Sequence, residues 1–349
     1  FKQKTAYEIG VRLVGSEMCI RDRAYQVRSD FATLQSYFEV LHAVEDGKPN
    51  VPLDEAEIRE RIGESLDSYW TSSEKLTRNS PRLSKRAPYN EYPAKATVMQ
   101  VVYLGHEMDT NAEKIVTLLT GFEEKFPEHV EAFETVARTR IIALQKTGYY
   151  TQLEESVNDI YARYEPEKEA ELLSDLSEVL EKDIRKLRKR NDREKEMVAK
   201  RILARLQEEW LRHGGEFEED QSPDRFRYDL AQLYLDTKQY EKAEPIYREL
   251  ESKQGAYSIV STVGLARISE VQGNEQSALS LWETMVKATQ VGDVLWFRGT
   301  FEVARLNESL GNSEQACKTV NGAQRMLKRL GDERLRTKIQ QFAAQTCGA

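Results

Sequence analysis

The sequence predicts an all-α protein, an αα-superhelix built from antiparallel helix pairs, on three observations. Apolar residues recur at steps of three and four through most of the chain, which indicates helices with one buried face. Only 9 of the 349 residues are proline and 32% are charged, as expected for thin helical layers that bury one stripe and solvate the rest. One helix-turn-helix pattern also occurs three times between residues 224 and 346, and such recurrence is typical of solenoids.

The three copies align on an alanine that follows a turn, at Ala243, Ala278 and Ala316, with intervals of 35 and 38 residues. Each copy has a large-small pair upstream of this alanine: Leu230-Ala231, Leu265-Ala266 and Val303-Ala304. Small side chains let neighbouring helices approach closely. A Lys or Gly that ends the first helix stands five residues before the alanine: Lys238, Gly273 and Gly311. A bulky residue stands four residues after it: Tyr247, Trp282 and Val320.

These features at these offsets resemble the tetratricopeptide repeat (TPR), a helix pair of about 34 residues. The first copy, FRYDLAQLYLDTKQYEKAEPIYREL, matches best, whereas Ser269 and Asn307 stand in the other copies where the family prefers an aromatic residue. The resemblance implies a TPR-like solenoid whose groove binds a protein or peptide. We expect residues 224–346 to form three repeats and a capping helix over residues 333–346.

Residues 1–23 are expected to lie outside the fold. The stretch from Val11 to Arg23, VRLVGSEMCIRDR, resembles translated sequencing adapter found at the ends of unrelated reading frames. If so, the segment is artefactual or disordered, Cys19 leaves the cysteine count, and the natural N-terminus with any signal peptide is missing. An ordinary flexible N-terminal segment is the alternative.

Residues 24–92 predict an N-terminal helical region. Its first helix has apolar residues at helical spacing: Val27, Phe31, Leu34, Phe38 and Leu41. Asp54 and Glu57 then have the spacing of a capping box at the start of a second helix, which we expect to end near Leu76. Residues 77–93 contain three prolines and no apolar period, so they predict an irregular linker and a domain boundary.

Residues 94–213 predict degenerate TPR-like hairpins. In the first, one helix is expected to run through Ile115 and Phe122 to Phe126 before Pro127. A second pair covers residues 131–164. Residues 168–213 predict a hairpin of two long helices divided near Asn191.

No pattern of catalytic residues is present. The four histidines lie far apart in sequence, without the paired spacing that binds a metal, and phosphate-binding glycine loops and Cys-x-x-Cys motifs are absent. We therefore expect no enzymatic activity, no metal and no cofactor. The net charge of −8 argues against a general nucleic-acid binder, and no apolar run reaches the roughly 20 residues of a membrane helix. The basic run from Lys182 to Lys195 alternates with acidic and apolar residues, which favours a solvated helix face.

The first helix of each repeat lines the groove in the TPR family. Carried over by position, the resemblance places Leu235 and Val263 in the groove and implies these partner-binding residues: Arg225, Tyr228, Gln232, Arg267, Glu270, Arg298, Phe301, Arg305 and Glu308. Gln232, Arg267 and Arg305 occupy equivalent positions and should form a polar ladder. The alternative is that Arg267 with Glu270, and Arg305 with Glu308, are surface ion pairs on one helix. The ladder lacks the asparagine and lysine pattern that binds a terminal carboxylate, so that specificity is not predicted.

Cys317 and Cys347 stand 14 residues before and 16 residues after Gly331, which centres the last turn. At about 1.5 Å per residue, an antiparallel pair brings both to the same level. A disulfide is therefore available and would imply an oxidising compartment. The alternative is two free thiols in the cytoplasm.

Together these features predict a non-enzymatic protein-protein interaction scaffold in a bacterial cell envelope, periplasmic once a lost signal peptide is assumed. The alternatives are a cytoplasmic TPR adaptor or regulator, and the binding module of a larger enzyme truncated at its N-terminus. The partner, the pathway and the oligomeric state do not follow from the sequence.

Overall fold

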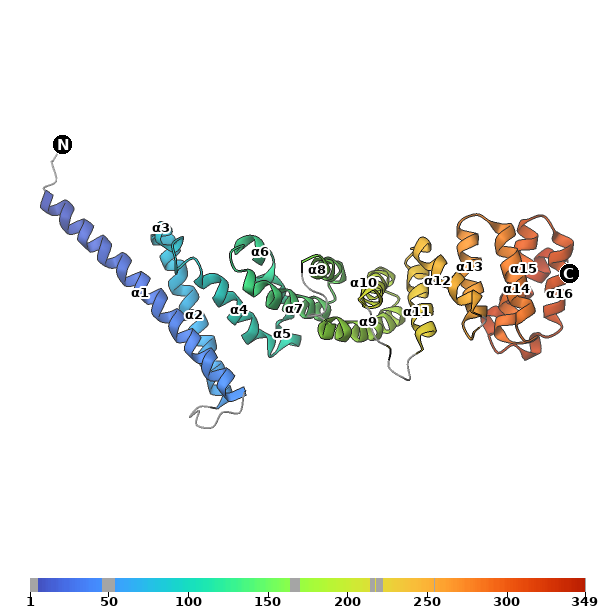
Figure 1. Cartoon of the computed structure of the whole chain (residues 1–349), viewed down its shortest axis with the longest axis horizontal. Helices are drawn as coiled ribbons and strands as arrows, with labels where there is room; N and C mark the ends of the chain where they lie inside the picture. The colour runs from blue at the N-terminus through green and yellow to red at the C-terminus, as the bar shows by residue number, and fades with distance from the viewer. Residues whose placement is uncertain are drawn as a thin grey trace. The chain divides into compact units, whose positions relative to one another are not determined.

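The computed structural model describes residues 6–45, 54–163, 170–213, 217, 222–253 and 255–348. Within these ranges every regular element is a helix, and most successive helices pack against each other (Figure 1). The predicted all-α class of paired helices is therefore confirmed. The chain divides into two compact units, Phe1–Leu172 and Leu173–Ala349, and neither of the boundaries predicted near residues 93 and 213 coincides with this division.

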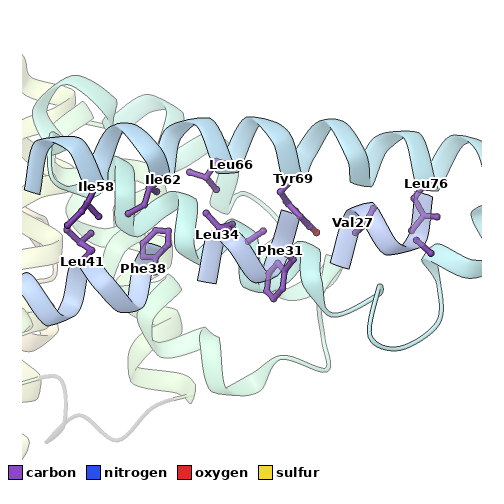
Figure 2. Close-up of a cluster of buried hydrophobic side chains, with 12 residues drawn as sticks. Val27, Phe31, Leu34, Phe38, Leu41, Ile58, Ile62, Leu66, Tyr69 and Leu76 are labelled. Carbon is purple, nitrogen blue, oxygen red and sulfur yellow. The ribbon is translucent and has the colours of Figure 1, made fainter. Parts of the chain in front are cut away.

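The first unit opens with two long helices, α1 (Ala6–Glu45) and α2 (Glu55–Asn79). Asp54 caps α2, because its Oδ1 accepts the backbone N–H of Glu57 at 2.7 Å. Figure 2 shows the apolar side chains of the two helices interleaving along one seam, in which Leu34 and Ile58 have no exposed surface. Ala24 is the first residue of this buried cluster.

The start of α1 at Ala6 places a helix inside the segment expected to be artefactual or disordered. That the segment derives from adapter sequence stays a prediction.

The segment predicted as a linker contributes to the same cluster. Helix α2 continues to Asn79, α3 (Pro81–Ser84) follows, and α4 (Tyr92–Gly105) begins before the linker was expected to end. Tyr92 stacks on Phe31, with ring centroids 4.2 Å apart, and Tyr89 meets Tyr92 edge-to-face. The sequence pattern missed this packing because single aromatic rings bury large areas without any helical period.

The rest of the first unit contains α5 (Met108–Leu119), α6 (Phe122–Lys125), α7 (Val130–Thr147) and α8 (Tyr150–Arg163). The single helix expected to reach Phe126 is instead broken, because Gly121 adopts a left-handed conformation with φ 66°. The break still leaves Phe122 fully buried. Glu123 on α6 pairs with Arg140 on α7 at 2.6 Å, which ties the short helix to its neighbour.

The second unit begins with α9 (Ala170–Arg190) and α10 (Arg193–Arg212). The division falls at Asn191, which has φ 57°, and Asp192 caps α10. Figure 1 shows α9 across the view and α10 along its axis, so the two helices run in different directions rather than as a parallel-sided hairpin. In the basic run, Lys186 pairs with Asp183 at 3.0 Å and Arg188 with Glu196 at 3.1 Å, as on a solvated helix face.

Three helix pairs and a final helix follow, and each helix packs against the next. They are α11 (Pro223–Asp236), α12 (Tyr240–Ser252), α13 (Ser258–Val271), α14 (Glu275–Ala288), α15 (Val294–Ser309), α16 (Ser313–Gln324) and α17 (Glu333–Thr346), with a 3-10 turn, η2 (Leu327–Arg329), before α17. Contacts also join α11 to α13, the first helices of two neighbouring pairs, and α15 to the final helix α17.

The three pairs share one turn geometry. The residue that ends each first helix is left-handed, with φ of 62° at Lys238, 78° at Gly273 and 80° at Gly311. In each turn the following N–H donates to a carbonyl five residues back at 2.8 Å, which is a Schellman motif. The aligned alanines after the turns have no exposed surface. Equivalent positions in the sequence therefore have equivalent roles in the fold.

Candidate functional site

A cleft of about 450 Å³ lies among the helix pairs of the second unit. Four of the residues predicted to bind a partner line it: Arg267, Glu270, Arg298 and Arg305. Leu235, which was also expected in the groove, completes the lining together with five residues that the prediction did not include: Asp236, Tyr240, Val271, Trp282 and Glu302. Most of these residues come from α11, α13 and α15, the first helices of the three pairs.

One hydrogen-bonded network organises the cleft. The indole N–H of Trp282 donates to Glu270 Oε1 at 2.8 Å, and the other carboxylate oxygen of Glu270 accepts from Arg305. Glu302, one turn before Arg305 on α15, accepts from its Nε at 2.6 Å. Although burial alone would lower the pKa of Arg305, its hydrogen bonds and charge interactions with Glu302 and Glu270 raise it. Arg305 is therefore a fixed cation with both carboxylates engaged.

Arg267 and Arg298 differ from Arg305. Both side chains are exposed. Within the described residues, neither forms an ion pair or a hydrogen bond with its side chain. Each therefore presents its guanidinium to solvent at the edge of the cleft. A planar guanidinium binds carboxylates through two parallel hydrogen bonds, so both arginines are available for an anionic ligand.

The remaining carboxylate of the cleft is also paired. Asp236 Oδ2 accepts from Lys200 Nζ at 2.8 Å, and the same ammonium pairs with Glu196 at 2.7 Å. The Lys200 side chain is only 8% exposed, so this pair ties α10 to the end of α11. Apolar surface stands beside these charges, since Leu235, Tyr240 and Val271 also line the cleft.

The predicted polar ladder does not form a row of free side chains. Gln232 donates to the Tyr247 hydroxyl at 2.6 Å, so it holds a buried tyrosine. Arg305 is engaged by two carboxylates, and only Arg267 remains accessible. Equivalent sequence positions therefore carry different tasks.

The other predicted residues lie away from the cleft. Tyr228 contacts the rings of Tyr247 and Tyr257, and burial raises its pKa although Arg267 opposes the shift. Phe301 packs edge-to-face on Phe342 of α17, within the C-terminal cluster. Arg225 is exposed and lies 3.8 Å from Asp229. Glu308 is partly buried and is absent from the cleft lining.

Neither of the two ion pairs named in the alternative forms, although Arg305 does pair with a glutamate on its own helix. Glu270 pairs with Arg305 of the next repeat rather than with Arg267. Arg305 pairs with Glu302 rather than with Glu308. A glutamate three residues before the arginine and one three residues after it are equally well spaced to pair with it. The neighbouring helix decides which of the two forms the ion pair. Trp282 was the available signal in the sequence that a nearby carboxylate is already engaged, because a buried indole N–H needs an acceptor.

Cys317 on α16 and Cys347 at the end of α17 are joined in a disulfide, with their Cα atoms 5.3 Å apart. The bond fastens α17 over the last helix pair, where Leu335 and Ile339 pack into the C-terminal cluster. Cys19 is a free, exposed cysteine.

Two further properties bear on function. Among the described residues no three His, Cys, Asp or Glu side chains are grouped to hold a metal ion. Within those same ranges no helix combines the length and apolarity needed for a membrane span.

Comparison with protein-family models finds no match, and comparison with curated protein sequences finds none either. Among solved structures, a tetratricopeptide repeat protein from Parabacteroides merdae aligns with a TM-score of 0.34 at 14% identity, covering 90% of this chain and 99% of that one. A Podosopora anserina protein with nearly identical TPR-like repeats aligns with a TM-score of 0.31 at 15% identity, covering 64% of this chain and 100% of that one. Values this low carry no function or partner from those proteins to this chain.

Proposed function

We propose that this chain is a TPR protein that acts as a scaffold, and that the cleft lined by Arg267, Arg298 and Arg305 receives a segment of a partner protein. The observation that supports this most is the contrast within the cleft. Arg305 is fixed by two carboxylates, whereas Arg267 and Arg298 are exposed beside apolar side chains. Arginine next to aromatic and aliphatic surface is the composition that protein-binding sites favour.

The bacterial cell envelope is the compartment we propose, because the disulfide between Cys317 and Cys347 persists only where the environment is oxidising. The second candidate is a cytoplasmic adaptor with the same cleft and free thiols. Placing the scaffold within a larger enzyme has no structural observation in its favour.

A photo-crosslinking amino acid tests the use of the cleft. Introduced at Val271, which lines the cleft and is 61% exposed, it should give an adduct with a partner protein in cells that express the full chain. Introduced at Ser280, which is exposed on α14 and outside the cleft, it should not. Equal adducts from both positions, or an adduct from Ser280 alone, would contradict the proposal.

A further inference from the structure

Three arginines and three carboxylates line the cleft, so its formal charges balance, but its charged groups are not equally engaged. Glu270 and Glu302 share Arg305, and Asp236 shares Lys200 from α10 with Glu196. Each lining carboxylate therefore already accepts from a cation. Arg267 and Arg298 are the two lining cations that form no ion pair with the described residues.

The carboxylates of the cleft already accept from cations, whereas the guanidinium groups of Arg267 and Arg298 keep their donors free of the described residues. The unused hydrogen-bonding groups of the cleft are therefore mainly cationic, which favours an anionic ligand. Leu235, Tyr240 and Val271 add apolar surface along the same cleft, so the ligand that fits both features carries carboxylates and apolar side chains on one chain.

We propose that the cleft binds an extended acidic peptide segment, with Arg267 and Arg298 each receiving a carboxylate and an apolar side chain lying against Leu235, Tyr240 and Val271. This inference rests on the proposed function and names the chemistry of its partner. Arg305 is a positioning residue, since Glu270 and Glu302 occupy its guanidinium and Trp282 orients Glu270.

The test is selection of short random peptides, displayed with both ends blocked, on the immobilised full-length protein. The wild type should enrich peptides rich in Asp and Glu that also carry an apolar residue. Free peptides from this set should bind the double variant Arg267→Glu and Arg298→Glu at least about tenfold more weakly, because two charge-assisted contacts become repulsive. Replacing Glu by Gln in the peptides should weaken binding to the wild type similarly.

A matched variant controls for the change in net charge. Arg248→Glu with Arg325→Glu alters the charge of two exposed arginines of the same unit that lie outside the cleft, and it should leave affinity within about twofold. Arg267 and Arg298 make no ion pair in the fold, so their replacement should not unfold it, and circular dichroism checks this. The indole N–H signal of Trp282, assigned with a Trp282→Phe variant, reports whether a peptide occupies the cleft.

The outcomes separate the two proposals. Enrichment of neutral or basic peptides that shift the Trp282 signal would overturn the acidic specificity and leave the scaffold proposal standing. Acidic peptides that bind both double variants equally would overturn the roles of Arg267 and Arg298. Peptides that bind without shifting the Trp282 signal, or no enrichment at all, would overturn both proposals.

Discussion

The seam between α1 and α2 and the three helix pairs from α11 to α16 solve the same packing problem in different ways. In the seam, large side chains such as Phe31, Phe38 and Tyr69 fill the space between two long helices. In the pairs, fully buried alanines such as Ala231, Ala266 and Ala304 let the helices approach each other. Large side chains stabilise the seam, whereas the close approach of the helices stabilises the pairs.

The difference teaches which changes each region tolerates. A seam of large side chains is sensitive to the loss of volume, because a cavity remains where the side chain was. Closely approaching helices are sensitive to added volume, because the neighbouring atoms have no space to move into. Mutations of opposite kind should therefore damage the two regions.

The largest effect is expected in the seam. Leu34 has no exposed surface, and Leu34→Ala should lower the free energy of unfolding by about 2 to 5 kcal/mol because it leaves a cavity between α1 and α2. Leu34→Met keeps the volume and should cost less than about 1.5 kcal/mol. Hydrogen exchange of the α1 and α2 amides measures both. If Leu34→Ala lowered the free energy of unfolding as little as Leu34→Met, the seam would not be sensitive to lost volume, and the distinction between the two regions would fail.

The next largest effect is expected at the disulfide that joins the last helix pair to α17. Replacing Cys317 and Cys347 by serine should lower stability by about 2 to 4 kcal/mol in oxidising buffer, because a link across 30 residues restricts the unfolded chain. Urea denaturation measures it, with Cys19→Ser as the control that should change nothing. Thiol titration of the unfolded chain without reductant should find one thiol among the three cysteines. Three thiols would contradict both the bridge and the envelope proposal.

The smallest effect is expected where two helices of the repeats approach each other closely, and it tests that approach directly. A Cβ added at Gly264 would lie 2.5 Å from the ring of Tyr247, which is buried and hydrogen-bonded to Gln232. Gly264→Ala should therefore lower stability by about 1 to 3 kcal/mol. Gly322→Ala, in a helix with open space around the new methyl group, should raise it by about 0.5 to 1 kcal/mol. Thermal denaturation compares the two, and a stabilising Gly264→Ala would show that these helices have room to spare.

The repeats were predictable because each signal is local. A glycine or lysine stop, a small residue and a bulky one recur at fixed offsets, and the turns at Gly273 and Gly311 follow directly from the left-handed conformation that glycine adopts readily. The packing of Tyr89 and Tyr92 was not predictable in this way. Tyr92 contacts Phe31, about sixty positions earlier in the chain, and Tyr89 packs against the same cluster; no pattern within the segment between residues 77 and 93 records these contacts.

The cleft was predictable only in part for a related reason. The resemblance to the TPR family placed Arg267, Glu270, Arg298 and Arg305 on the groove-lining first helices, and they do line the cleft. It could not decide which of them pair with each other, because the choice of Glu302 over Glu308 depends on the neighbouring helix that brings Glu270 to Arg305. Phe301 was assigned to the groove, yet it contacts Phe342 on the helix that follows the last repeat.

The ion pair between Glu270 and Arg305 has a mechanical consequence. Glu270 belongs to α13 and Arg305 to α15, so the bond that shapes the cleft also spans the junction between two successive repeats. Arrays of this kind deform at such junctions, because each unit touches only its neighbours. Tension that draws α13 away from α15 would part Glu270 from Arg305 and leave Arg305 held by Glu302 on its own helix, so the shape of the cleft would vary with the load that the array carries.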